Sequence, residues 1–360
     1  MFDLELTDEQ KLVRDTLQSF ATERIQPIAR ECDEAGAIPG TLAAQAFELG
    51  LIHSPLPEAF GGYGEIRSAV TGAIVAEELG HGDLSIALHL LAPRLLAYAL
   101  VDGGSEEQKA RFLPAFTAGP HAATAAVVEP RFDFDTTTFA VEARREGSDW
   151  IINGEKCLVP LAAEASAILV LAQTDAGPGA FIVERDRAGL SIGEREKNMG
   201  LRALATHHVS LSGVRVPETN RLPALDVPRW LDHGRVALAA LACGMARGAS
   251  VFAREYAKDR KAFGMAIAQK QAVAFMLADM AIEVDSMRLL IWEAAWRLDQ
   301  GLPAGVECAR ARRYAAASTL KVADNALQVL GGHGYIRDYP VELWLRNARG
   351  LTAFEGMAIV

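Results

Sequence analysis

The sequence predicts an α+β protein in which helices come first, a compact β segment follows, and long helices end the chain. Helical signals mark residues 1–120 and return after Pro228, whereas 121–225 carries short aliphatic runs separated by turn residues. Strands and helices do not alternate, so a parallel, doubly wound sheet of the Rossmann type is not expected. We therefore predict three domains, at 1–120, 121–225 and 226–360.

The N-terminal segment has two marked helix starts. Thr7 and Gln10, and likewise Ser105 and Gln108, have the spacing of a capping box, in which the hydroxyl and the carboxamide satisfy free amides of the first turn. Between them, the proline- and glycine-rich stretch 55–64 predicts a loop that separates two helical parts.

The middle segment contains runs typical of β-strands, such as 167–171 and 180–183. Asn153 and Gly154 follow Trp150-Ile151-Ile152 and predict a hairpin turn, because both residues tolerate positive φ. The connection to the last domain is expected at 217–228.

In the C-terminal segment, apolar residues recur at helical spacing across 268–300, which predicts one buried helix face. These residues are Val273, Met276, Met280, Val284, Met287 and Ile291. A second long helix is expected at about 305–330.

Composition excludes several classes of protein. The chain has 360 residues, half of them hydrophobic, and a formal net charge of -10, which argues against nucleic acid as a partner. Its four cysteines are widely spaced and favour a reducing compartment. The longest apolar run, 236–246, is shorter than the about 20 residues of a membrane span, and the acidic N-terminus lacks the cationic start of a targeting peptide. We expect a cytoplasmic protein without a membrane span.

Glu355 is the candidate general base. It lies beside Gly356 in an otherwise apolar stretch, where desolvation raises the pKa of a carboxylate toward that of a working base. The alternative is a solvated glutamate at a helix end.

Two charged groups are candidate ligand-binding sites. Asp232 and Arg235 lie three residues apart and share a helix face, so they form either a ligand site or an intrahelical ion pair. The run 259–264, with Arg260 and Phe263, offers cations and an aromatic ring beside a helix end, as a pyrophosphate seat or as solvated charges before a glycine cap.

The run 328–335 contains Gly331 and Gly332, which allow the backbone to approach a ligand closely. It is not the dinucleotide fingerprint, and an interhelical turn is the alternative. His333 is expected to be a hydrogen-bonded turn residue, because no metal-ligand constellation accompanies it.

Taken in order, these segments resemble the acyl-CoA dehydrogenase family over nearly the whole chain. The most specific parts are 260–264, Gln271, 278–280, 328–335 and 339–342. The resemblance implies a helical domain, a β-barrel-like middle domain and a C-terminal four-helix bundle. It also implies a homo- or hetero-tetramer that binds FAD, an acyl-CoA substrate, and an electron-transfer flavoprotein as acceptor.

The resemblance also assigns roles to single residues. Glu355 matches the glutamate that removes the α proton of the thioester while a hydride leaves the β carbon for the flavin. In some relatives the base comes instead from the position of Gly234, so Glu355 is the matched base here. Asp232 and Arg235 match positions that line the acyl-CoA site. The residues that match those holding the ADP half of a neighbour's FAD are Arg260, Phe263, Gln271, Gln328, Gly331 and Gly332.

Departures from the family pattern cluster where a subunit holds its own flavin ring. Val128 and Phe134 replace hydroxyl residues, and Leu158 with Pro160 replace parts of a Trp-Ile-Thr segment. Three hypotheses follow: a self-sufficient dehydrogenase, a catalytically silent partner that completes a related subunit's site, and a flavin oxidase or monooxygenase. A retained Glu355 suits α-proton abstraction and disfavours the third.

Overall fold

The structure is a computed structural model that describes residues 5–360. The first four residues, on which part of the targeting-peptide argument rests, lie outside the described residues. The N-terminal helices are α1 Asp8–Phe20, α2 Ala29–Ala35, α3 Gly40–Glu48, α4 Ala69–Gly82, α5 Leu84–Leu91, α6 Arg94–Gly103, α7 Glu106–Phe112 and α8 Pro114–Thr117. Both predicted capping boxes are present, at the starts of α1 and α7. The stretch 55–64 connects α3 to α4, as predicted, and contains one short 3-10 turn.

The middle of the chain forms one mixed sheet. Its strands are β1 Thr124–Ala126, β2 Glu142–Glu146, β3 Asp149–Pro160, β4 Ala167–Thr174, β5 Gly177–Glu184, β6 Leu190–Arg195 and β7 Thr206–Pro217. The spatial order is β1-β4-β2-β3-β7-β6, with β5 paired to β4. No helix joins one of these strands to the next, so the predicted absence of a Rossmann arrangement is confirmed.

Asn153 and Gly154 do not form the predicted hairpin turn, and that prediction is wrong. Both lie inside β3, and the turn between β2 and β3 is made by Gly147 and Ser148. Gly154 has a φ of 134° at a register shift in the β3–β7 ladder, and Oδ1 of Asn153 accepts a hydrogen bond from Gly213 N at 2.7 Å. The positive φ of Gly154 therefore accommodates a β-bulge in β3.

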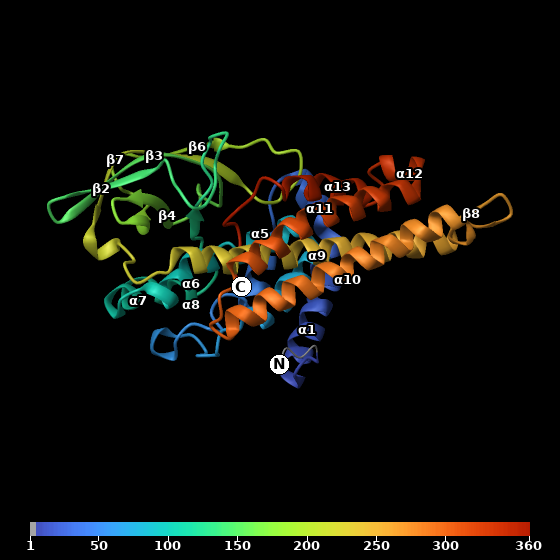
Figure 1. The fold of residues 1–360 in the computed structure, drawn as a ribbon, viewed down its shortest axis with the longest axis horizontal. Helices are drawn as coiled ribbons and strands as arrows, with labels where there is room; N and C mark the ends of the chain where they lie inside the picture. Colours follow the sequence, from blue (N-terminus) through green and yellow to red (C-terminus); the bar gives the residue numbers. More distant parts are fainter. Residues whose placement is uncertain (1–4) are drawn as a thin grey trace.

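The C-terminal part consists of long helices. They are α9 Val227–Asp259, α10 Gln271–Asp299, α11 Gly305–Leu330, α12 Gly332–Tyr335 and α13 Val341–Gly350, with a small hairpin of β8 Lys261–Ala262 and β9 Met265–Ala266 after α9. Figure 1 shows α9, α10 and α11 running along the long axis, with the sheet at one end and β8 at the other. In α10, Met280, Val284, Met287 and Ile291 of the predicted stripe are buried.

Helices α4 and α9 cross at glycines. A Cβ at Gly244 would lie 1.9 Å from the carbonyl oxygen of Glu77, and one at Gly80 would lie 2.3 Å from that of Leu241. Beside the crossing, Arg247 pairs with Glu78 at 2.5 Å. The two helices therefore touch backbone to backbone, which fixes α9 against the N-terminal helices.

By length and composition alone, α9 could cross a membrane. In its most apolar window, however, 78% of the residues are buried inside the protein. This burial is typical of the core helix of a globular protein, and no other single helix among residues 5–360 passes the same test.

Candidate functional site

Glu355 lies in the segment after α13. Its side chain is 28% exposed, while Phe354 and Gly356 on either side are buried. A Cβ at Gly356, where φ is 62°, would lie 2.3 Å from a methyl group of Val127, which follows β1. The chain therefore needs glycine to press this segment against the sheet, and Glu355 keeps access to solvent from a largely apolar surrounding.

Arg312 on α11 holds the segment that carries Glu355. Its Nη2 donates hydrogen bonds to the carbonyl oxygens of Leu351 and Phe354, the latter at 2.6 Å. Its Nε lies 3.7 Å from Oε1 of Glu355. Burial lowers the pKa of Arg312, and the charge of Glu355 opposes that shift. The sequence analysis missed Arg312, because its partners are backbone oxygens from a distant segment.

Asp232 and Arg235 on α9 form the predicted ion pair, with Nη1 of Arg235 at 2.7 Å from Oδ1 of Asp232. The pair does more than stabilise its own helix, since Nη2 of Arg235 donates to Oγ1 of Thr136 at 2.8 Å, in the loop before β2. Burial raises the pKa of Asp232, while Arg235 opposes the rise. The positive charge of Arg235 also lowers the pKa of Arg312. A helix, a sheet loop and α11 thus meet near Glu355.

The residues after Glu355 are packed inside the protein. Met357 to Val360 are buried. A Cβ at Gly234 would lie 3.2 Å from the carbonyl oxygen of Ala358. Glycine at 234 therefore leaves room for this segment where some relatives carry a base.

The residues expected beside a flavin ring lie close to one another. Val128 accepts a backbone hydrogen bond from Cys157, next to Leu158, whose φ is 54°. Pro160 is buried at the end of β3 and Phe134 is half-buried in the nearby loop. None of these four side chains carries a hydroxyl group, and Val128 and Pro160 are buried.

At the far end of α9, the structure brings three predicted FAD residues together. Arg260, Gly331 and Gly332 line one cavity of about 360 Å³ with Tyr256 and His333. A Cβ at either glycine would meet no atom within 4 Å, so the backbone there is open to a ligand. The cation of Arg260 beside an accessible backbone is suited to a pyrophosphate group, so the residues of this cavity fit the ADP half of FAD.

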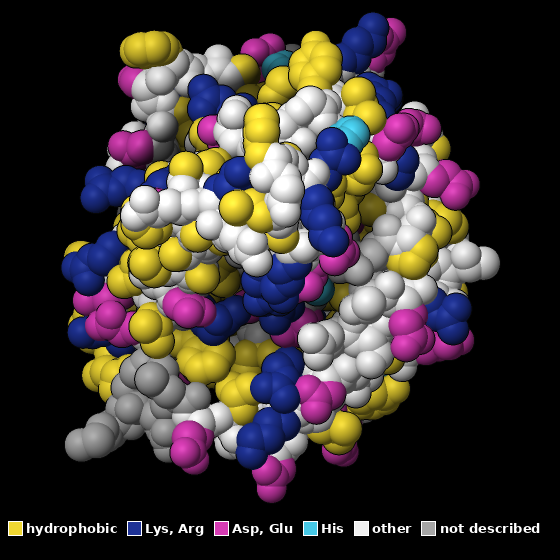
Figure 2. Space-filling model, turned by 90° about the vertical axis from the view of Figure 1, so that its right-hand side faces the viewer, with side chains coloured by type: hydrophobic (Ala, Val, Ile, Leu, Met, Phe, Trp, Pro, Cys, Tyr) yellow, Lys and Arg dark blue, Asp and Glu magenta, His cyan; other side chains and the backbone are white. Residues whose placement is uncertain are grey.

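The other three predicted FAD residues lie outside that cavity lining. Phe263 is 93% exposed at the tip of the β8–β9 turn, with Nζ of Lys270 at 5.0 Å from its ring centre. Gln271 and Gln328 are exposed on α10 and α11. Figure 2 shows this end of the molecule, where Lys and Arg side chains lie among exposed hydrophobic ones.

The two groups of site residues are far apart along one helix. Asp232 lies near the start of α9 and Arg260 just after its end. At a rise of about 1.5 Å per residue, roughly 42 Å separates them. Glu355 and the Arg260 cavity therefore lie near opposite ends of the same helix.

His333 is hydrogen-bonded, since its Nδ1 lies 2.6 Å from the hydroxyl oxygen of Tyr256, but it lies in the short helix α12 and not in a turn. Within residues 5–360, no group of three or more His, Cys, Asp or Glu side chains is arranged to hold a metal ion.

Comparisons with known proteins identify the family. The N-terminal domain of acyl-CoA dehydrogenases matches residues 7–120, the middle domain matches 124–214 and the C-terminal domain matches 227–358. The chain is 36% identical to a probable acyl-CoA dehydrogenase of Bacillus subtilis, over 98% of this chain and 96% of that protein.

Solved structures agree with this result. One chain in a structure of the electron transferring flavoprotein of Acidaminococcus fermentans is 32% identical, with a TM-score of 0.89 over 98% of this chain and 96% of that one. A glutaryl-CoA dehydrogenase of Mycobacterium smegmatis in complex with FADH2 is 27% identical, with a TM-score of 0.88 over 98% and 92%. The predicted fold is confirmed, and the chain belongs to the acyl-CoA dehydrogenase family of FAD-dependent enzymes.

Proposed function

We propose that Glu355 is the base that removes the α proton of an acyl-CoA thioester in an FAD-dependent dehydrogenation. The observation that carries the proposal is the convergence on Glu355 of a buried arginine, the Asp232–Arg235 pair and the end of β1. FAD, when bound, supplies the acceptor for the hydride that leaves the β carbon.

In this proposal each protein group has a defined task. Glu355 accepts the α proton on a carboxylate oxygen. Arg312 positions it by holding the carbonyl groups of the preceding residues, and a fixed base transfers a proton faster than a mobile one. Asp232 and Arg235 bind the acyl-CoA where α9 meets the sheet loop at Thr136. The packed apolar residues on either side of Glu355 limit the contact of this carboxylate with water to one side.

The separation along α9 supports an oligomer. Glu355 lies beside Arg312, which is 19 residues before Gly331 along α11, so roughly 28 Å separates the base from the Arg260 cavity at a rise of about 1.5 Å per residue. The cavity with Arg260, Gly331 and Gly332 serves the ADP half of a neighbouring subunit's FAD. Large hydrophobic residues stand exposed on the same end, including Phe263 and Tyr335 at 93% and 86%. Such exposure suits burial against another subunit.

Other parts of the proposal rest on the family. The electron acceptor is an electron-transfer flavoprotein, and the enzyme works in the cytoplasm as a tetramer. Because full-length relatives at 34–36% identity are named as acyl-CoA dehydrogenases, a dehydrogenase is favoured over a catalytically silent partner subunit.

The test is Glu355→Gln, compared with Glu9→Gln on the exposed face of α1. Purified with excess FAD, each protein is mixed with an acyl-CoA and the bleaching of flavin absorbance is followed. Loss of the carboxylate should slow bleaching by about 10²- to 10⁴-fold with unchanged flavin content, while the control behaves as wild type. An unchanged rate in Glu355→Gln would assign the base elsewhere.

The same preparation separates the two remaining hypotheses. One flavin per chain, bleached by substrate, supports a self-sufficient dehydrogenase. A colourless protein that gains flavin only with a related subunit supports the silent partner.

A further inference from the structure

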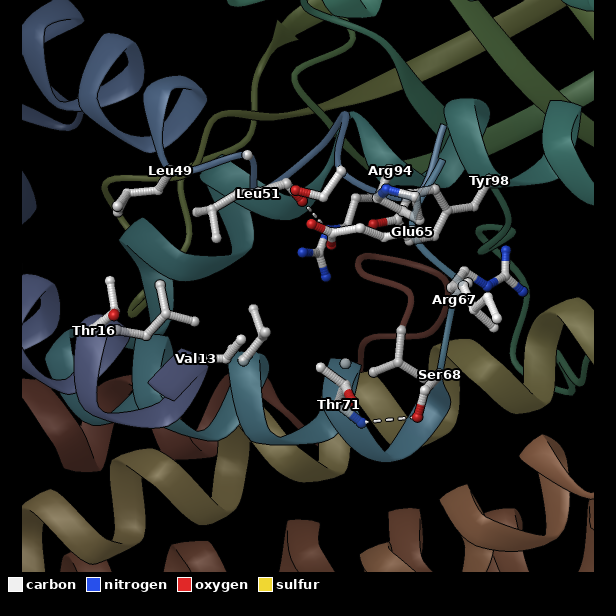
Figure 3. Close-up of a pocket in the computed structure, with 18 of the residues that line it drawn as sticks. Val13, Thr16, Leu49, Leu51, Glu65, Arg67, Ser68, Thr71, Arg94 and Tyr98 are labelled. Carbon is white, nitrogen blue, oxygen red and sulfur yellow. Dashed lines mark hydrogen bonds between the residues drawn. The ribbon is translucent and has the colours of Figure 1, made fainter. Parts of the chain in front are cut away.

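A second cavity lies among the N-terminal helices. It has a volume of about 290 Å³ and lies between α1, the start of α4, the segment 49–55 and α6 (Figure 3). Aliphatic side chains form much of its wall, namely Leu12, Val13, Leu49, Leu51 and Val75. Glu355, Asp232 and Arg235 are not among the lining residues, so the cavity is separate from the proposed active site.

Arg94 places a buried cation in this cavity. The residue is only 5% exposed, and its Nε donates to the carbonyl oxygen of Leu51 at 2.6 Å. Figure 3 shows the rest of the guanidinium pointing into the cavity. Among residues 5–360, Arg94 has no carboxylate within ion-pair distance and no other hydrogen-bond acceptor. Burial accordingly lowers its pKa.

Arg67 differs from Arg94 although both line the cavity. Its Nη2 donates to Asp102 at 2.8 Å, so its charge already has a partner. The two guanidinium groups lie at 5.1 and 5.4 Å from the ring centre of Tyr98, which helps to fix both. Among the described residues, Nη1 of Arg67 is buried without a hydrogen-bond partner, so Arg67 as well as Arg94 has a donor without an acceptor, but only the charge of Arg94 has no carboxylate partner.

Glu65 is an acidic residue in the cavity wall. It is exposed, and it forms no ion pair with Arg94 in the described part of the chain. Its carboxylate nevertheless repels an incoming anion, so Glu65 weakens anion binding. It does not take the place of a bound anion, because it does not pair with Arg94.

We propose that this cavity binds a small amphipathic carboxylate. The carboxylate accepts hydrogen bonds from the two Nη groups of Arg94, whose fork matches its geometry, and the aliphatic chain lies against Leu12, Val13 and Leu49. The volume equals roughly ten water molecules at about 30 Å³ each, which suits a chain of moderate length. Arg94 has no anionic partner among the described residues, and such a ligand supplies one. The proposal does not depend on the proposed catalytic role of Glu355.

The experiment is calorimetric titration of the FAD-loaded protein with octanoate and with octan-1-ol. Octanoate should bind one per chain, and octan-1-ol, which has the same tail without the charge, at least tenfold more weakly. In Arg94→Met, octanoate affinity should fall at least tenfold. Equal binding of acid and alcohol, no binding of octanoate, or unchanged affinity in Arg94→Met would overturn the proposal.

Two variants away from the buried guanidinium keep the test valid if Arg94→Met does not fold. Glu65→Gln removes the repelling charge and should tighten octanoate severalfold. Val13→Phe fills part of the cavity from α1, where Val13 is half-buried, and should weaken the binding of octanoate. Opposite or absent effects in both variants would count against the site.

A further titration tests whether octanoate binds in this cavity or in the acyl-CoA site. Glu355→Gln saturated with an acyl-CoA should still bind octanoate with unchanged stoichiometry. Displacement of octanoate by the acyl-CoA would place it in the substrate site and refute a second cavity, whatever the outcome for Glu355 in catalysis.

Discussion

Nε of Arg312 lies 3.7 Å from Oε1 of Glu355, while Nη2 of the same guanidinium binds carbonyl oxygens of the segment that carries this glutamate. One side chain thus fixes both the charge and the backbone of the proposed base. The arginine is buried, so its hydrogen bonds are not exchanged for bonds to water.

Arg312→Gln should therefore lower the rate of flavin bleaching at saturating acyl-CoA by at least tenfold. It should also reduce the free energy of unfolding by about 1–3 kcal/mol, because buried carbonyl groups lose their donor. Arg313→Gln, on the exposed side of α11, is the matched control. Stopped-flow spectroscopy and urea unfolding measure both effects, and an Arg312 variant with wild-type kinetics would contradict the positioning role.

Much of the helical framework could be predicted because its determinants are local. The capping boxes at Thr7 and Ser105 act within four residues, and the stripe on α10 follows from helical spacing. Asn153 and Gly154 show the limit of local signals. Gly154 does have a positive φ, but Asn153 does not, and pairing with β7, which lies 50 or more residues later, makes the site a β-bulge and not a turn.

The site was predicted in part for the same reason. Glu355 and the Asp232–Arg235 pair were found from the family pattern and their spacing. Arg312 and Thr136 were missed, because their roles depend on the approach of α11 and the sheet loop in the folded chain. Arg312 stands in an alanine-rich helix stretch, where an arginine resembles a solvated surface residue.

Gly244→Ala should destabilise the protein by about 1–3 kcal/mol or more, because the added methyl group would collide with the backbone of α4. Gly40→Ala is the control, since a Cβ there meets no atom within 4 Å. Denaturant midpoints of the two variants should differ clearly. Equal midpoints would show that α4 and α9 separate at little cost.

Lys156 and Glu129 form a buried pair with 3.0 Å between Nζ and Oε1, and Glu129 also accepts the backbone N–H groups of Ala140 and Val141. Lys156→Met should cost about 1–3 kcal/mol, because the buried Glu129 loses a hydrogen-bonded cation and keeps only the less buried Arg131, whose Nε lies 3.2 Å from Oε2. Adding Glu129→Gln should recover part of the loss, since the amide oxygen still accepts those N–H groups. A double variant less stable than Lys156→Met alone would contradict this account.

Burial lowers the pKa of His81 to about 4, with Arg247 lowering it further and Glu77 opposing the shift. The ordinary pKa is 6.5, so between pH 6.5 and 4 the unfolded chain binds the proton and the folded chain does not. Stability is thus lost as pH falls through this window. His81→Gln should flatten the dependence of the unfolding free energy on pH there, as urea unfolding at a series of pH values would measure; an unchanged pH dependence would contradict this account.

Phe263→Ser should weaken subunit assembly, because it removes the most exposed aromatic side chain at the β8 end. Phe132→Ser is the control, since Phe132 is 108% exposed but lies in the loop between β1 and β2. Sedimentation velocity over a range of protein concentrations measures the effect. Equal dissociation of both variants would argue against the β8 end as an interface.

The length of α9 has a genetic consequence. If the residues at its two ends serve different flavins, a defect at Arg260 and a defect at Glu355 fall in different copies of the active site. Subunits carrying Arg260→Ala and subunits carrying Glu355→Gln, each inactive alone, should complement one another when unfolded and reassembled together. Because α9 separates the FAD-binding residues from the catalytic base, two variants that are each inactive alone should form an active mixed oligomer.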